Sequence, residues 1–166
     1  PDNHRTGSEK QPLRCAILIS GSGTGMQALL RHQKSKQHCN HQTLLVISNN
    51  PDAGGIKIAE ALEIPVKVLP LADIEDKTER RLNHELQISN CLKEYDIELI
   101  ILSGYMRLLS EQFVENWDMK ILNIHPSLLP KFPGAHAHKD VLSAGVKISG
   151  CSVHYVDAGM DTGQII

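Results

Sequence analysis

An amide and an imidazole lie two residues apart at the start of residues 123–130, NIHPSLLP, which follow an apolar segment and lead into a proline-rich loop. An amide N–H can stabilise a developing oxyanion, and an imidazole can move a proton near neutral pH. Because residues i and i+2 of an extended chain point to the same side, Asn123 and His125 can meet one substrate. The pair is typical of an acyl-type transfer site, and a structural histidine at a strand end is the plainer interpretation.

A downstream loop, residues 157–163 with the sequence DAGMDTG, carries the carboxylate that we expect to complete this site. We expect Asp161 to face His125, where a carboxylate favours the imidazolium form and orients the ring. The plainer interpretation of the loop is a surface turn with solvated aspartates.

A glycine-rich segment, SGSGTG at residues 20–25, lies between an apolar run and a segment of helical spacing. Glycines let backbone N–H groups approach an anion, and a helix N-terminus adds partial positive charge. The segment is neither a Walker A loop nor a G-x-G-x-x-G fingerprint. Its position after a strand favours phosphate binding over a tight turn capped by serine or threonine.

Nine histidines in the chain raise the question of a metal site. The candidate ligands are His125, His136, His138, His154, Asp157 and Asp161. H-x-H spacing is common in a histidine-rich chain, and no H-E-x-x-H or C-x-x-C motif accompanies it here. We therefore predict that no metal takes part.

Apolar runs of strand length alternate with segments of helical spacing, which favours an α/β domain with a largely parallel sheet. The predicted strands are 15–20, 44–48, 66–69, 99–102, 121–124 and 151–156. The predicted helices follow residue 25 and cover 53–63, 73–95, 111–117 and a turn at 141–144. Within 73–95 the expected apolar positions are Leu82, Leu86 and Leu92. Ligands of such folds bind beyond the carboxyl ends of strands, where the glycine-rich segment, residues 104–107 and His125 all fall.

The composition bounds the partners and the compartment. A chain of 166 residues is long enough for one domain, and a net charge of −2 predicts no nucleic-acid or membrane partner. Four widely spaced cysteines (Cys15, Cys39, Cys91 and Cys151) predict buried reduced thiols in a cytoplasmic protein. Residues 1–13 are polar and lack periodicity, so we expect a flexible tail or linker before a domain at 14–166.

Together these residues resemble the folate-dependent formyltransferase superfamily and, within it, the phosphoribosylglycinamide formyltransferase family. The likeness covers residues 14–166 and rests on the runs 122–134, 150–156 and 161–166. The glycine-rich opening favours this branch over methionyl-tRNA formyltransferases, and the residues after His125 favour it over formyltetrahydrofolate hydrolases. The resemblance implies a Rossmann-like formyltransferase fold with a mostly parallel central sheet flanked by helices.

The resemblance implies formyl transfer from 10-formyltetrahydrofolate to the glycyl amine of glycinamide ribonucleotide in purine biosynthesis, a reaction of one-carbon metabolism. The implied catalytic residues are Asn123, His125 and Asp161. The implied phosphate loop is Gly23, Thr24 and Gly25. The implied folate-binding residues are Arg81, Met106, Arg107, Leu108, Leu109, Asn123, Asp157, Ala158, Gly159, Met160 and Asp161. Otherwise Arg81 belongs to a solvated helix face, and residues 106–109 begin a helix with Leu108 and Leu109 in the core.

Two features depart from the family pattern. The family usually has Ser-Asn where this chain has Thr24-Gly25, and it continues for several elements beyond Ile166. We therefore expect a domain truncated at its C-terminus with weakened nucleotide binding. The alternatives are a formyltetrahydrofolate hydrolase, a non-catalytic folate- or nucleotide-binding fragment and, more remotely, a sugar-nucleotide formyltransferase. The polar tail fits a domain of a multifunctional purine-synthesis polypeptide and equally a standalone enzyme.

Overall fold

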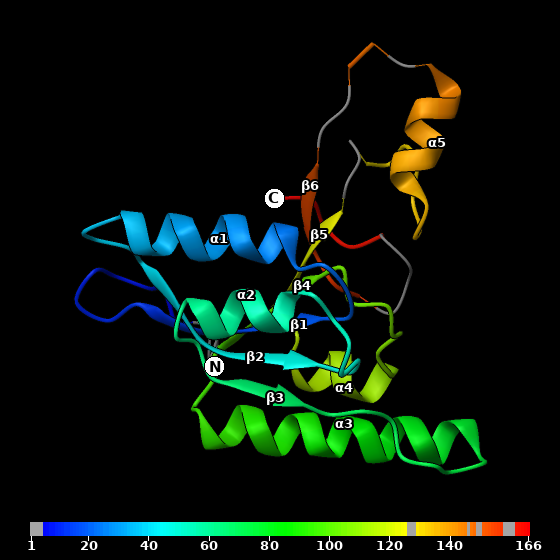
Figure 1. Cartoon of the computed structure of the whole chain (residues 1–166), viewed down its shortest axis with the longest axis horizontal. Coiled ribbons are helices and arrows are strands. Elements are labelled where there is room, and N and C mark those ends of the chain that lie inside the picture. The colour runs from blue at the N-terminus through cyan, green and yellow to red at the C-terminus, as the bar shows by residue number, and fades with distance from the viewer. Residues whose placement is uncertain (1–4, 126–128, 146, 149–150, 158–161) are drawn as a thin grey trace. The chain divides into compact units, whose positions relative to one another are not determined.

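The computed structural model describes residues 5–125, 129–145, 147–148, 151–157 and 162–166 (Figure 1). The chain consists of two compact units, Pro1–Tyr105 and Met106–Ile166. None of the described helices is long and apolar enough to cross a membrane.

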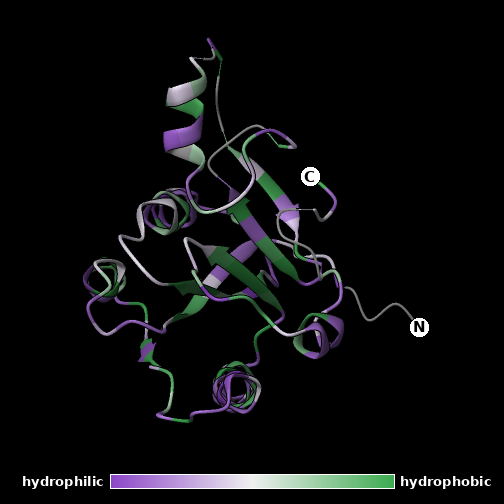
Figure 2. Ribbon diagram, turned by 90° about the vertical axis from the view of Figure 1, so that its right-hand side faces the viewer, coloured by the Kyte–Doolittle hydropathy of each residue, from purple (hydrophilic) through white to green (hydrophobic). Residues whose placement is uncertain are grey.

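The first unit is built on four parallel strands. These are β1 (Leu13–Ile19), β2 (His41–Ser48), β3 (Val66–Val68) and β4 (Leu99–Ser103). β1 pairs with both β2 and β4, and β2 also pairs with β3. Residues 15–19 of β1 are fully buried, as expected for the apolar central strand of a parallel sheet covered on both faces. Figure 2 shows the central strands as largely hydrophobic.

Three helices flank this sheet. They are α1 (Thr24–Ser35), α2 (Gly55–Ala61) and α3 (Lys77–Glu94). Figures 1 and 2 show α1 and α2 on one side of the strands and α3 on the other. The right-handed rule for connections between parallel strands explains this arrangement, because the chain reverses its direction across the sheet after β3.

Helix α3 begins later than predicted and buries a different face. It starts at Lys77 because the Asp76 side chain caps it, accepting a hydrogen bond from the Glu79 N–H at 2.8 Å. Two of the three expected apolar positions are wrong, since Leu82 and Leu86 are 50% and 62% exposed. The buried residues are His84, Glu85, Ile88 and Leu92, which recur with helical spacing. His84 is satisfied there by donating from Nε2 to the Leu69 carbonyl at 2.7 Å.

The described residues of the second unit form two strands and two helices. They are α4 (Glu111–Asn116), β5 (Ile121–His125), α5 (Ala137–Ala144) and β6 (Ser152–Tyr155). β5 and β6 run antiparallel, with Asn123 opposite His154 and His125 opposite Ser152. The α5 helix begins four residues before the predicted turn at 141–144, because the polar residues at its start have no apolar periodicity to mark them.

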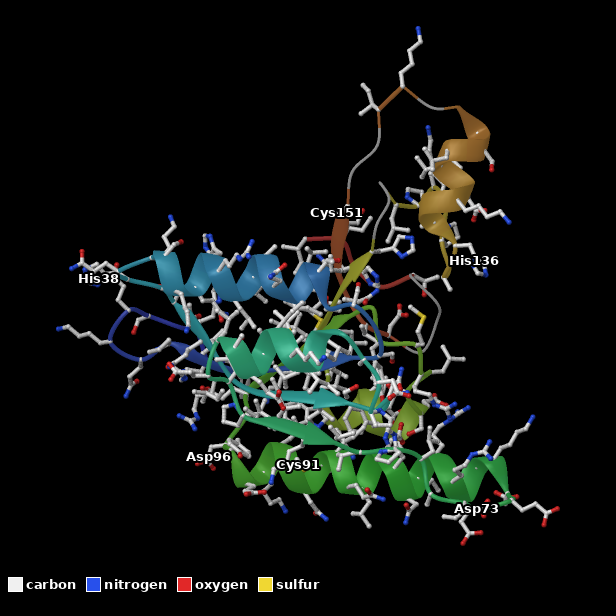
Figure 3. All side chains as sticks on the ribbon, in the orientation of Figure 1. His38, Asp73, Cys91, Asp96, His136 and Cys151 are labelled. Carbon is white, nitrogen blue, oxygen red and sulfur yellow. The ribbon has the colours of Figure 1, made fainter. Side chains whose placement is uncertain are left out.

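All four cysteines are free, and the expectation of buried thiols holds only in part. Cys15 is buried, Cys39 and Cys91 are half-buried, and Cys151 is exposed (Figure 3). Burial raises the pKa of the Cys15 thiol to about 12, so this side chain is a protonated apolar group of the core. The prediction that Cys151 is buried is wrong. Cys151 is the first residue of the predicted strand 151–156, but β6 begins one residue later and Cys151 is exposed.

Within the first unit, an ion pair joins Arg5, which precedes β1, to Glu98, which precedes β4. Arg5 donates from Nε and Nη2 to the two carboxylate oxygens of Glu98, each at 2.7 Å, and these bonds hold the pKa of Glu98 below its ordinary value. A carboxylate with a lowered folded-state pKa stabilises the fold above its unfolded pKa, and that stability is lost as pH falls through the lowered value.

We therefore expect Glu98→Gln to cause a small drop in Tm at pH 7, because the pair is partly exposed. The difference in Tm between Glu98→Gln and the parent protein should shrink as the pH is lowered through the range in which carboxyl groups titrate. Thermal unfolding from pH 7 to pH 3 measures this, with the exposed Glu94→Gln as the matched control. A difference in Tm that grows as the pH falls would contradict the lowered pKa of Glu98.

Candidate active site

The glycine-rich loop joins β1 to α1 in the first unit. Gly23 is the N-cap of α1 with φ of 69°, in the left-handed region, and no side chain caps the helix. The first N–H groups of a helix have no intrahelical carbonyl partner, so they are suited to bind an anion. Ser22 and Thr24 are exposed beside them, and their hydroxyls can add further hydrogen bonds.

The loop after β2 braces this segment. Ser20 donates from Oγ to Asn49 Oδ1 at 2.6 Å, and Asn50 donates from Nδ2 to the Ser20 carbonyl at 3.2 Å. The backbone N–H of Gly55, at the start of α2, donates to the Gly21 carbonyl at 3.0 Å. These contacts fix the backbone of a loop that has few side chains of its own.

Gly23 has no room for a side chain. A Cβ at this position would lie 2.7 Å from the Gly55 Cα, and its φ is unfavourable for any other residue. We expect Gly23→Ala to destabilise the protein by at least about 1 kcal/mol, the usual lower cost of the left-handed region, and to raise KM for a phosphorylated substrate. Chemical denaturation and steady-state kinetics measure the two effects.

Gly21→Ala is the matched control, because a Cβ at Gly21 meets no atom within 4 Å. It should leave both the stability and KM close to those of the parent. If Gly23→Ala and Gly21→Ala changed the stability and KM equally, the left-handed backbone of Gly23 would not be the cause of the changes.

Gly25 is one of the two positions of this loop where we expect a departure from the family pattern. A Cβ there would lie 2.9 Å from the Ser103 Oγ, at the end of β4. A larger residue at this position therefore requires the Ser103 hydroxyl to shift. The backbone N–H of Gly25 remains in the first turn of α1, so a main-chain contact to an anion needs no side chain.

Asn123 lies on β5 and is held by the neighbouring strand. Its Nδ2 lies 3.1 Å from His154 Nε2, and His154 Nδ1 lies 3.0 Å from the Tyr155 carbonyl. A carbonyl only accepts, so His154 Nδ1 carries the proton and Nε2 accepts from the Asn123 amide. His154 is only 2% exposed, which fixes the orientation of the amide that we expect to donate to an oxyanion.

His125 is also held through one ring nitrogen. Its Nε2 donates to the Phe132 carbonyl at 2.7 Å, and the side chain is 4% exposed. The same loop is tied to β6, where the Leu129 N–H donates to the Ser152 hydroxyl at 3.0 Å. Contacts from the loop and from β6 thus lie close to His125.

The other predicted site residues are only partly described. Ala158, Gly159, Met160 and Asp161 lie outside the described residues. Asp157 is exposed and accepts a hydrogen bond from Thr162 Oγ1 at 2.9 Å. Its contact with a loop residue agrees with the turn-forming character of 157–163.

The segment 106–109, which is predicted to bind folate, has irregular backbone structure. Residues 106–110 precede α4 and belong to no helix, so the interpretation of 106–109 as a helix start is wrong. Met106 and Leu108 are 64% and 63% exposed, which also excludes Leu108 from the core. Exposed apolar side chains suit an aromatic ligand.

Arg81 lies in the first unit on α3. It is half-buried rather than solvated, and its Nε is buried without a hydrogen-bond partner among the described residues. The solvated-face interpretation is therefore wrong for this residue. A guanidinium with an unsatisfied N–H is suited to donate hydrogen bonds to a carboxylate ligand.

Residues 13–166 match the formyl transferase family, and the chain belongs to it. The phosphoribosylglycinamide formyltransferase of Bacillus subtilis is 40% identical over 151 residues, which cover 91% of this chain and 75% of that protein. The trifunctional purine biosynthetic protein adenosine-3 of Gallus gallus is 44% identical over 154 residues, 93% of this chain.

The chain spans 15% of the length of the Gallus gallus protein. Among solved structures, the phosphoribosylglycinamide formyltransferase from Brucella melitensis has a TM-score of 0.83 at 41% identity, covering 93% of this chain and 77% of that one. The glycinamide ribonucleotide transformylase 1 from Symbiobacterium toebii has the same TM-score at 37% identity, covering 93% and 71%. The predicted formyltransferase fold with a mostly parallel sheet is confirmed.

Proposed function

We propose that this chain transfers a formyl group from 10-formyltetrahydrofolate to the glycyl amine of glycinamide ribonucleotide, in purine biosynthesis. The observation that carries the proposal is the likeness to the Bacillus subtilis phosphoribosylglycinamide formyltransferase, of which this chain covers three quarters. The arrangement on β5 supports it, because a fixed amide donor and a fixed imidazole lie two residues apart there.

In the proposed reaction the substrate amine attacks the formyl carbon and the carbonyl oxygen becomes an oxyanion. Asn123 stabilises this oxyanion through an amide N–H whose direction is set by His154. The imidazolium of His125 stabilises the same charge. Asp161 orders a water that carries the proton from the amine to the leaving N10.

Binding is assigned to two further groups of residues. Gly23, Thr24 and Gly25 bind the phosphate of the nucleotide through the N-terminus of α1. The folate is bound by the apolar segment before α4 and by the loop that follows β6, while Arg81 binds its carboxylates. These folate residues are Arg81, Met106, Arg107, Leu108, Leu109, Asn123, Asp157, Ala158, Gly159, Met160 and Asp161.

We further propose that the protein acts in the cytoplasm, takes no metal into the reaction and contacts neither nucleic acid nor membrane. It is also proposed to be a domain of a multifunctional polypeptide, because the relatives from Gallus gallus and Homo sapiens are trifunctional purine biosynthetic proteins.

Nucleotide dependence tests the proposed activity. The chain is incubated with 10-formyltetrahydrofolate, and folate product is followed by absorbance with and without glycinamide ribonucleotide. Turnover that requires the nucleotide supports the transferase. Equal turnover without the nucleotide would identify a formyltetrahydrofolate hydrolase, and folate binding without any turnover would identify a binding fragment.

A further inference from the structure

A cluster of three metal-ligand side chains lies at the far end of α1. His32 is in the last turn of α1, Cys39 lies in the connection that follows, and His41 begins β2. One ligand atom from each lies within 4.8 Å of the others, and no other such group occurs among the described residues. The sequence did not single it out, because His32 stands seven residues before the C-x-H pair.

One distance in this cluster matches that of a tetrahedral site. Cys39 Sγ lies 3.6 Å from His41 Nε2. Zinc bonds of about 2.3 Å to sulfur and about 2.0–2.1 Å to nitrogen, at tetrahedral angles, place those two atoms about 3.6 Å apart. The rings of His32 and His41 are stacked with centroids 6.2 Å apart, and the exposed His32 can turn to close the remaining gap.

We propose that His32, Cys39 and His41 bind a zinc-like divalent cation, with water as the fourth ligand. Thiolate and imidazole together favour zinc over magnesium or calcium, which prefer oxygen ligands. Thr24 and His32 are eight residues apart on α1, about 12 Å along the axis, so the site is separate from the proposed phosphate loop. The bound ion would fasten the connection between α1 and β2.

One neighbouring side chain limits the affinity. Gln33 accepts from the Thr43 N–H through Oε1 at 3.2 Å, so its Nε2 donates to His41 Nδ1 at 2.8 Å. The proton of His41 is therefore on Nε2, the nitrogen that faces Cys39. Metal binding at His41 Nε2 moves this proton to Nδ1. The atom of Gln33 that faces Nδ1 is the amide nitrogen, which cannot accept a hydrogen bond.

Gln33→Glu should remove that conflict. A carboxylate accepts from both the Thr43 N–H and a His41 Nδ1–H, as in the carboxylate–histidine–zinc arrangement, and such partners change metal affinity by about 10- to 100-fold. We therefore expect Gln33→Glu to bind the ion at least about 10-fold more tightly than the parent, which a merely structural cluster would not do.

Titration of the reduced protein with Co²⁺ tests the site, because a cobalt–thiolate bond gives a near-ultraviolet charge-transfer band. The parent should show the band, Cys39→Ser should lose it, and His41→Gln should weaken binding at least about 10-fold. The controls are Cys91→Ser and His38→Ala; His38 lies in the same connection (Figure 3) but outside the cluster. Both controls should keep the band and the affinity.

A thermal shift with Zn²⁺ provides the second readout and shows that each variant is folded. Zn²⁺ should raise the Tm of the parent and of Gln33→Glu more than that of Cys39→Ser. The proposal is overturned by a parent that shows no band, by a band that survives in Cys39→Ser, or by equal weakening in His38→Ala and His41→Gln.

Discussion

Replacing Asn123 with alanine is expected to lower kcat by about 100- to 1,000-fold, the usual cost of removing one oxyanion donor. The amide is held by the buried His154 at 3.1 Å, so its direction is set before the substrate binds. KM for folate and for nucleotide should change little, because the interaction strengthens only in the transition state. Steady-state kinetics with both substrates measures this.

Asn116→Ala is the matched control, since Asn116 is an exposed amide at the end of α4 and belongs to no proposed site. It should retain the parental kcat. The Asn123 variant also leaves a buried histidine without its donor, which costs about 1–3 kcal/mol, so its folded fraction is checked by thermal unfolding. A folded Asn123→Ala protein with near-parental kcat contradicts the oxyanion role.

His125→Gln is expected to lower kcat by about 100- to 1,000-fold, the usual cost of removing a group that stabilises the oxyanion. Glutamine places an amide N–H where His125 Nε2 donates to the Phe132 carbonyl, so the contact that holds the loop can be kept. Glutamine carries no charge, so the electrostatic stabilisation of the oxyanion by the imidazolium is lost. The variant therefore separates chemistry from structure.

The kinetics of His125→Gln are compared with those of His136→Gln, whose parent side chain is exposed at the start of α5 (Figure 3). The His136 variant should keep the parental kcat and pH profile. If the His125 variant kept the pH dependence of the parent as well, the ring of His125 would not take part in the reaction.

Most strands of the first unit could be predicted from the sequence because each is a continuous apolar run between turn residues. The residues of β1 from 15 to 19 are fully buried, and such runs have few alternative structures. Helix α3 shows the limit of this reasoning. Its buried face includes His84 and Glu85, so apolar residues alone did not mark it, and Leu82 and Leu86 were placed in the core wrongly.

The candidate site was predicted from residue types and spacing, which identified Asn123 and His125. The role of His154 could not be found this way, because it depends on the register of β6 against β5, which places His154 opposite Asn123. Nothing in the local sequence sets that register. The same holds for the Phe132 carbonyl, since backbone acceptors carry no signal in residue type.

The fate of the formyl carbon tests the central claim most directly. The protein is supplied with glycinamide ribonucleotide and with 10-formyltetrahydrofolate labelled with carbon-13 in the formyl group, and the products are identified by mass spectrometry. The account predicts label in the formylated nucleotide, one for each tetrahydrofolate released, and its loss in Asn123→Ala. Label recovered as free formate, with the nucleotide unchanged, would contradict it.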